Sequence, residues 1–170
     1  QPKVLNLKEI LQEFIKHRKD VVTKRTKFEL KKAKDRGHIV EGLMVAIANI
    51  DAIITIIKKS KDPKIAAAEL CKKTWKAGPI EAILKKVGKD ACKPKGLSAD
   101  LGLKGKNYKL SPDQAKSILE LRLGRLTGLE QDNLSSEFNE LIEKIQKLQE
   151  ILDDKNVLQG VVRDLSLIHI

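Results

Sequence analysis

The chain has 170 residues and a mass of 19.0 kDa, which suits one ordinary domain or a small domain with an arm and argues against a complete multidomain enzyme. Charged residues make up 34% and aromatic residues only 3%, a composition typical of helices rather than of β-sandwiches. The net charge is +11 and uneven, with 14 basic and 7 acidic residues in 1–60, 13 and 5 in 61–109, and 7 and 11 in 110–170. Contact with a polyanion and a simple need for solubility explain this excess equally well.

A long helix is predicted near the N-terminus. Asn6 is a good N-cap, and Glu9 follows at the spacing of a capping box. The apolar residues that recur along the helix are Leu7, Leu11, Phe14, Val21 and Phe28, with no proline before Pro63. A helix that runs to about Ile50 would measure about 65 Å, whereas a globule of this size has a radius of about 15 Å. The helix therefore has to project, or to be clasped by another helix.

A second row of regularly spaced apolar residues, near the C-terminus, predicts a helix that packs against the first. Its residues step by four and three, the spacing of a coiled-coil seam: Leu134, Phe138, Leu141, Ile145, Leu148 and Leu152. We predict that this ladder pairs antiparallel with Leu7, Leu11, Phe14 and Val21, in a register whose paired residue numbers sum to 159. That register also puts Arg18 and Arg25 in the seam, and a neighbouring face through Ile10, His17 and Lys24 is equally regular.

Proline and glycine divide the segment between the two ladders. We expect an apolar helix broken near Asn49–Asp51, a helix that starts at Pro63 and includes Trp75, a helix from Pro79 to Gly88, a loop over Lys89–Lys109, and a helix that starts at Ser111–Pro112. The predicted fold is all-α, a long antiparallel two-helix coiled-coil arm with a small helical head at its distal end. Its expected parts are an outgoing arm helix 1–32, a head 33–128, a returning arm helix 129–153, a final helix 154–165, and a non-native tail 166–170 that we exclude from fold reasoning.

Catalytic and metal-binding motifs are not found. The sequence has no phosphate-binding glycine loop, no dinucleotide fingerprint and no zinc-protease motif, and its three histidines are scattered. Cys71 and Cys92 lack a CxxC spacing and a nearby histidine, so we expect reduced thiols rather than zinc ligands. The apolar run from Ile39 to Ile57 is interrupted by polar residues, and the N-terminus lacks the layout of a signal peptide, so we expect neither a membrane span nor secretion. No catalytic, cofactor-binding or metal-binding residue is predicted.

A basic run on the first helix is the strongest charge feature. Ten Lys or Arg residues stand against three acidic residues from Lys16 to Arg36. The candidate DNA contacts are Arg18, Lys19, Lys24, Arg25 and Lys27. The alternative is that these cations pair with the acidic returning helix.

The segment 110–130, LSPDQAKSILELRLGRLTGLE, carries apolar residues on more than one helical face. The apolar surface of this segment exceeds what a small head needs to bury. It is contributed by Ile118, Leu121, Leu126 and Leu129. Self-association and core packing within the chain are both open readings.

Two stretches of the sequence resemble a known family. HRKDVVTKRTKFELKKAKDRGHIVEGLMVAIANID, followed later by LSPDQAKSILELRLGRLTGLE, is similar in order and spacing to the A subunits of bacterial DNA gyrase and topoisomerase IV, over about 160 residues. The matching region follows the DNA-cleaving head of those proteins and forms an arm with a dimerisation domain at its end, the exit gate or C-gate. Gyrase is favoured over topoisomerase IV.

The resemblance implies a cytoplasmic, nucleoid-associated homodimer that releases a transported DNA duplex through this gate and works with the gyrase B subunit. The parent enzyme would use ATP and Mg²⁺ through other domains to supercoil DNA negatively, so this chain would carry no cofactor and would be inactive alone. Tyr108 would not be the DNA-cleaving tyrosine. The implied dimer interface comprises Gln114, Ile118, Leu121, Arg122, Arg125 and Leu126.

Two other hypotheses remain from the residues themselves. One is a basic coiled-coil arm that binds nucleic acid without a topoisomerase role, and it predicts salt-sensitive binding by the monomer. The other is a purely structural coiled-coil protein. Two ladders of equal length within one chain favour a hairpin over a fibre.

Overall fold

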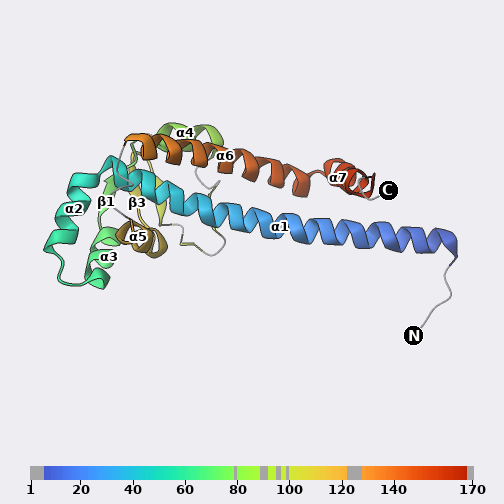
Figure 1. The fold of residues 1–170 in the computed structure, drawn as a ribbon, viewed down its shortest axis with the longest axis horizontal. Helices are drawn as coiled ribbons and strands as arrows, with labels where there is room; N and C mark the ends of the chain where they lie inside the picture. Colours follow the sequence, from blue (N-terminus) through green and yellow to red (C-terminus); the bar gives the residue numbers. More distant parts are fainter. Residues whose placement is uncertain are drawn as a thin grey trace. The chain divides into compact units, whose positions relative to one another are not determined.

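A computed structural model describes residues 6–78, 80–88, 92–94, 97–98, 100–121 and 128–167 of the chain. This part contains seven helices and three short strands, which confirms the predicted all-α class (Figure 1). The chain divides into two compact units. The terminal unit comprises Gln1–Lys32 and Lys144–Ile170, and the central unit comprises Ala33–Glu143.

Helix α1, Leu7–Ala48, is the longest element and begins where the capping signal predicts. The backbone N–H of Asn6 donates to Oε2 of Glu9 at 2.8 Å, and the N–H of Glu9 donates to Oδ1 of Asn6 at 2.9 Å. Two N–H groups that lack helical partners are therefore satisfied. The helix ends at the predicted break, and α2, Ile50–Lys59, leaves it at 91°.

The break is held by the side chain of Asn49. Its Nδ2 donates to the carbonyl oxygen of Val45 at 2.8 Å and to that of Lys76 at 2.9 Å. One amide group thus satisfies a carbonyl in the last turn of α1 and another at the end of a strand.

The central unit continues through short elements. These are α3, Pro63–Lys72; β1, Thr74–Lys76; α4, Ile80–Val87; β2, Gly102–Lys104; β3, Asn107–Lys109; α5, Pro112–Leu119; and the first part of α6, Gly128–Asp153. The helix starts at Pro63, at Ile80 after Pro79, and at Pro112 agree with the sequence signals.

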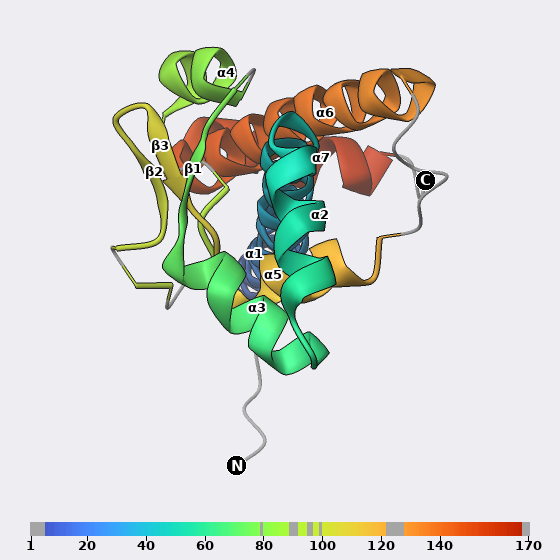
Figure 2. The same cartoon turned by 90° about the vertical axis from the view of Figure 1, so that its left-hand side faces the viewer.

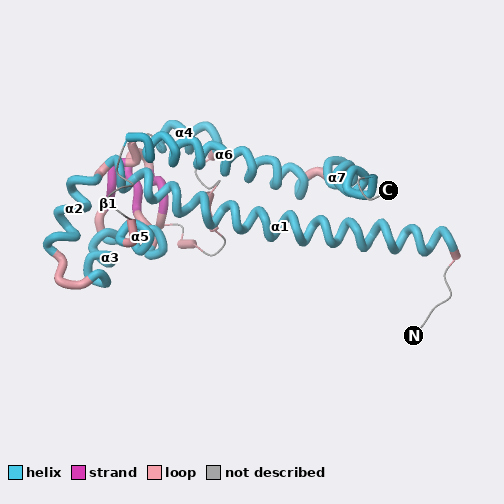
Figure 3. The backbone as a smooth tube through the Cα atoms, in the orientation of Figure 1, coloured by secondary structure: helices cyan, strands magenta, loops and turns pink. Residues whose placement is uncertain are grey.

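A three-stranded antiparallel sheet of order β1-β3-β2 lies on one flank of the central unit (Figures 2 and 3). Trp75 and Leu103 both pair with Tyr108 in the central strand. Gly105 has a φ of +65° in the two-residue turn between β2 and β3, a conformation that favours glycine. Two predictions are wrong here, namely that Trp75 belongs to a helix and that Lys89–Lys109 is a loop throughout. Strands of three residues are too short to carry a recognisable alternation.

The core of the central unit lies among α1, the sheet and the short helices. Its fully buried side chains include Val40, Val45, Leu70, Ile80, Leu84, Tyr108 and Leu110. Helix α3 packs against both α2 and α5. Figure 2 shows α2, α3 and α5 gathered near the C-terminal end of α1.

The terminal unit contains Leu7–Lys32 of α1, Lys144–Asp153 of α6, and α7, Lys155–Leu167. Oδ1 of Asp154 accepts a 2.7 Å hydrogen bond from the N–H of Asn156 at the start of α7. The helix includes Ser166 and Leu167, two residues of the expected tail, and the other tail residues 168–170 lie outside the described residues.

The predicted register of the two ladders is wrong. Arg36 Nε donates to Oε1 of Glu137 at 2.7 Å, so these paired numbers sum to 173 rather than 159. The predicted register would instead have placed Val22 opposite Glu137. On the returning helix Leu134, Phe138, Ile145 and Leu148 are buried, whereas Leu141 and Leu152 are half-buried.

On α1 the buried residues also differ from those of the predicted seam. Leu7, Leu11, Phe14 and Val21 are exposed, and the buried residues of this part of α1 are Val22 and Thr26. Neighbouring residues of a helix point about 100° apart, so the buried face is rotated by one position from the predicted one. Small or polar side chains made this face inconspicuous in the sequence, since Thr26 and Ala33 do not register as a hydrophobic ladder.

Candidate functional site

The N-terminus of α5 is anchored by a complete capping box. The N–H of Gln114 donates to Oγ of Ser111 at 3.3 Å, and the N–H of Ser111 donates to Oε1 of Gln114 at 2.9 Å. Both side chains are buried, so their polar atoms depend on these partners. The sequence predicted the cap but not its burial.

The amide nitrogen of Gln114 links three elements. It donates to the carbonyl oxygen of His38 on α1 at 2.7 Å and to the hydroxyl of Tyr108 on β3 at 2.8 Å. Nδ1 of His38 lies 3.3 Å from the same nitrogen, and Nε2 of His38 lies 2.8 Å from Oγ of Ser111. A neutral imidazole with its proton on Nε2 fits both contacts. Burial lowers the pKa of His38, which agrees with the neutral form.

Glu41 completes this buried network. Its carboxylate accepts a hydrogen bond from the Tyr108 hydroxyl, and burial raises its pKa to about 7. Burial and the nearby Glu41 charge raise the pKa of Tyr108 far above its ordinary value. The described residues contain no buried side-chain nitrogen or oxygen that lacks a hydrogen-bond partner. We call His38, Glu41, Tyr108, Ser111 and Gln114 the polar network.

Gly42 allows the network to form. A Cβ at this position would lie 2.6 Å from Cγ of Gln114 and 2.8 Å from its Cβ and Cδ. The absence of a side chain lets α1 and α5 approach closely enough for the Gln114 amide to reach the backbone of α1. Sequence reasoning missed Glu41 and Gly42, although a carboxylate and a glycine within an apolar run were the available signal.

An apolar groove of about 70 Å³ lies beside the end of α5. It is lined entirely by aliphatic side chains, namely Ala46, Ile47, Ile50, Ile53, Ile54, Ile57, Ile118 and Leu121. Ile118 is buried, Leu121 is half-buried and Ile57 is exposed. The structure therefore brings two of the six expected interface residues to one groove and adds α2 to it.

The other four expected interface residues are Gln114, Arg122, Arg125 and Leu126. Gln114 is 1% exposed and belongs to the polar network, and its place in the interface between copies stays a prediction. Its polarity suggested exposure, but its hydrogen bonds are made inside the unit. Arg122, Arg125 and Leu126 lie outside the described residues.

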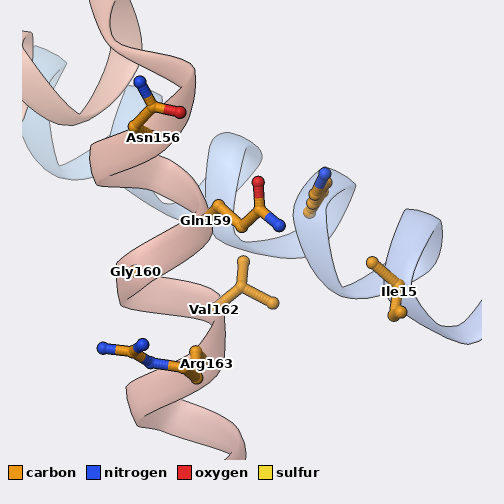
Figure 4. A pocket seen from close by; sticks show the side chains of 7 residues that line it. Ile15, Asn156, Gln159, Gly160, Val162 and Arg163 are labelled. Atoms are coloured by element: carbon orange, nitrogen blue, oxygen red, sulfur yellow. The ribbon is translucent and has the colours of Figure 1, made fainter.

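A larger groove of about 520 Å³ lies within the terminal unit between α1 and α7. Ile15 and Lys19 line it from α1, and Gln159 and Val162 point toward α1 from α7 (Figure 4). Arg163 points away from α1 in this view. The groove thus offers a surface of mixed character, with aliphatic, amide and cationic side chains along its walls.

The candidate DNA contacts have varied surroundings. Lys24, Arg25 and Lys27 are exposed, whereas Arg18 and Lys19 are half-buried. The Arg18 guanidinium lies 5.4 Å from the centre of the Phe14 ring, and Arg25 Nε donates to Oε1 of Glu29 on the same helix at 2.9 Å. The Arg36–Glu137 ion pair is an instance of the alternative, in which cations of α1 pair with α6.

The described residues offer no metal centre. No group of three or more His, Cys, Asp or Glu side chains there could hold a metal ion. Burial raises the pKa of Cys71, and it raises that of Cys92 to about 12. No single described helix has the length and hydropathy to cross a bilayer, and only α1 and α2 taken together, despite their 91° bend, meet that criterion of length and composition.

Comparison with known proteins identifies the family. The family model for the A subunit of DNA gyrase and topoisomerase IV matches residues 1–166. The chain belongs to this family. The DNA gyrase A subunit of Pseudomonas aeruginosa is 47% identical over 96% of the chain and 18% of that protein. The corresponding figures are 48%, 96% and 18% for Aeromonas salmonicida, and 46%, 81% and 16% for Escherichia coli K12. The chain therefore spans less than a fifth of the length of these gyrase A subunits.

The resemblance of the two sequence stretches to this family is thus confirmed. In this member of the gyrase and topoisomerase IV A-subunit family, Tyr108 is fully buried and its hydroxyl contacts Gln114 and Glu41. A hydroxyl enclosed in this way cannot reach a DNA backbone. This agrees with the expectation that Tyr108 is not a DNA-cleaving nucleophile.

Proposed function

We propose that this chain is the exit-gate module of a bacterial DNA gyrase A subunit. Its role is to hold two A subunits together and to open when a transported DNA duplex leaves the enzyme. The observation that carries the proposal is the family match over residues 1–166. Relatives that are DNA gyrase A subunits favour gyrase, with negative supercoiling as the parent activity, over topoisomerase IV.

The partners follow from this role. They are a second copy of the chain, double-stranded DNA and, in the intact enzyme, the gyrase B subunit. ATP and Mg²⁺ would act through other parts of the parent enzyme, so we expect this chain alone to have no supercoiling or relaxation activity. Its place would be the bacterial cytoplasm, in association with the nucleoid.

The groove between α2 and α5 is our candidate for the contact between copies. Leu121 is half-buried and Ile57 is 38% exposed in the single chain, so both retain apolar surface that a second copy could cover. A gate has to hold firmly and still open in each cycle, so we expect a contact of moderate size with polar groups at its rim.

Sedimentation of the purified chain tests this placement. Leu121→Asp should convert dimers to monomers, because a carboxylate would be buried without a partner at the contact. Ile65→Asp, on an exposed apolar residue of α3, is the matched control and should leave the dimer intact. Circular dichroism of both variants checks that the fold is retained. Dimers of Leu121→Asp as stable as those of the wild type would refute the placement.

A basic arm that binds nucleic acid without a topoisomerase role is the second candidate, favoured by the exposed cations Lys24 and Lys27. It predicts that a monomeric variant binds DNA as tightly as the wild type. The gate proposal predicts dimerisation whether or not DNA is present.

A further inference from the structure

The three-stranded sheet of the central unit has one buried face and one open face. Its strands lie side by side on the flank of the unit (Figure 2), and the residues paired across their centres, Trp75, Tyr108 and Leu103, are all buried. Neighbouring residues of a strand point to opposite sides of a sheet, so the residues next to these three form the other face. Its members, which we call the sheet face, are all exposed except for the half-buried Lys109: Thr74, Lys76, Lys104, Asn107 and Lys109.

Each strand contributes one lysine to the sheet face. Lys76 and Lys104 both pair with Asn107 of the central strand, so their Cα atoms lie two strand spacings apart, about 10 Å. Lys109 lies two residues farther along the same strand, about 7 Å from Asn107. Three ammonium groups are thus distributed over one small patch, and the two remaining residues are polar and uncharged.

Asp100 is the carboxylate that the structure places beside this patch. Its Oδ1 lies 2.7 Å from Nζ of Lys104, and its pKa is lowered by the hydrogen bond and charge of Lys104 and by the charge of Lys109. Both partners of this ion pair are exposed, so water and other anions compete with it readily. No carboxylate of a described residue pairs with Lys76 or Lys109. The sheet face therefore keeps an excess of positive charge.

Protection of the sheet edges explains only part of this pattern. Lysines on edge strands discourage pairing with another chain, and β1 and β2 are the two edges of this sheet. Lys109 lies on the central strand, where both neighbours are already present. A cation at that position indicates a further role for the face.

The composition of the sheet face favours a polyanion as its occupant. Protein interfaces commonly centre on aromatic anchors and are depleted in lysine, and segments that lie on membranes insert apolar side chains. The large apolar residues of all three strands face the core instead. Interfaces with DNA are polar and rich in positive charge, and Thr and Asn side chains contact phosphate as lysine does.

The same observation distinguishes a duplex from a single strand. Sheets that bind single-stranded nucleic acid stack its bases on aromatic side chains. Trp75 and Tyr108, the aromatic residues of this sheet, are 3% and 0% exposed and cannot stack on a base.

We propose that the sheet face binds the phosphate backbone of double-stranded DNA. DNA carries one negative charge per about 1.7 Å of its axis, so a patch about 10 Å across lies beside several phosphates. The three lysines would neutralise phosphates, and Asp100 would compete with DNA for Lys104. Contacts to the backbone alone give no preference for a base sequence. The sheet face shares no residue with the groove between α2 and α5 or with the basic run of α1, so this inference goes beyond the gate function and does not depend on it.

The test is a titration of a fluorescently labelled duplex of about 20 base pairs with the full chain at several salt concentrations. Lys76→Gln combined with Lys104→Gln removes two charges and keeps the length of both side chains. This double variant should weaken binding about tenfold at low salt and reduce the slope of log affinity against log salt by about 2. Lys61→Gln combined with Lys64→Gln is the matched control, because both lysines are exposed in the same unit and lie outside the sheet. It should change the affinity by less than about twofold.

Asp100→Asn provides a test in the opposite direction. It removes the carboxylate that holds Lys104, so binding should become about threefold tighter. Glu69→Gln removes the same charge from an exposed position on α3 and should bind DNA as the wild type does. A purely structural role of Asp100 would not make binding tighter. Circular dichroism checks that all four variants keep the fold.

Four outcomes would overturn the proposal. The first is equal weakening by the two pairs of lysine substitutions, which would make net charge the cause. The second is no gain of affinity in Asp100→Asn relative to Glu69→Gln. The third is tighter binding of a single-stranded oligonucleotide than of the duplex. The fourth is loss of binding to anionic phospholipid vesicles or to a polyglutamate peptide, but not to DNA, in the variant of Lys76 and Lys104.

Sedimentation keeps this test separate from that of the gate. The sheet-face variants should dimerise as the wild type does, since the groove between α2 and α5 is unchanged. A wild-type chain that remains monomeric would refute the gate contact and leave the DNA titration to decide on the sheet face.

Discussion

Among the glycines of the described residues, Gly42 is the one at which an added Cβ would meet the closest neighbours. An added methyl group would overlap the buried side chain of Gln114, which four hydrogen-bonding contacts hold in place. We expect Gly42→Ala to lower the free energy of unfolding by about 2 kcal/mol, although alanine favours a helix. Urea denaturation measures the effect.

Gly160 provides the control in the same background. It lies inside α7, and nothing approaches within 4 Å of a Cβ built there. Gly160→Ala should therefore raise the free energy of unfolding by about 0.5–1 kcal/mol. A stabilising effect of Gly42→Ala similar to that of Gly160→Ala would contradict the close packing of α1 on α5.

Glu41 is expected to make stability depend on pH. Its pKa is raised from 4.5 to about 7, so the folded chain holds this proton more tightly than the unfolded chain does. The resulting stabilisation is complete below about pH 4.5 and is lost as the pH rises to about 7. His38 acts in the opposite sense, because its lowered pKa disfavours the folded state as the pH falls.

Glu41→Gln isolates the first effect, since glutamine still accepts the Tyr108 hydrogen bond and cannot ionise. Relative to the wild type, the free energy of unfolding of the variant should rise by about 2 kcal/mol between about pH 5 and pH 8. Urea midpoints at four pH values measure this difference. A difference that stays constant with pH would show that Glu41 does not titrate in the folded chain over this range.

At the scale of elements, the bend between α1 and α2 depends on the donor capacity of Asn49. Its Nδ2 serves the carbonyl oxygens of both Val45 and Lys76, and aspartate has the same shape but cannot donate. Asn49→Ala should cost about 1–2 kcal/mol in stability. Asn49→Asp should cost at least as much, because its carboxylate would face two carbonyls, even though aspartate is a good N-cap. Thermal unfolding compares the two variants, and an Asp variant as stable as the wild type would contradict this role.

Helix boundaries could be predicted well because their signals are local. Asn6 with Glu9, Pro63, and Ser111 with Pro112 each mark a helix start within a few residues, and the structure begins α1, α3 and α5 there. Ile118 and Leu121 line one groove because Ile118 lies in the last turn of α5 and Leu121 follows two residues after its end, where the N–H of Leu121 still donates to the carbonyl oxygen of Ile118 at 3.2 Å.

Features that depend on distant partners could not be predicted in this way. The register between α1 and α6 could not be predicted from apolar spacing, because the buried residues of α1 include Val22, Thr26 and Ala33 rather than the large apolar residues of the expected seam. The burial of Gln114 depends on the space left by Gly42, far away in the sequence. Three-residue strands are defined by their pairing and not by their own composition.

For the molecule as a whole, the excess of positive charge predicts salt-sensitive binding to duplex DNA. If the arm cations contact phosphates, Lys24 and Lys27 are the best placed, because both are exposed and Arg25 is already paired with Glu29. Replacing Lys24 and Lys27 with alanine should reduce the slope of log affinity against log salt by about 2, one phosphate contact each.

The matched control replaces Lys58 and Lys59, which are exposed on α2, with alanine and so removes the same charge from the central unit. Fluorescence anisotropy with a short labelled duplex at four salt concentrations gives both slopes. Equal reductions in the two double variants would mean that DNA responds to the net charge of +11 and not to a site on α1.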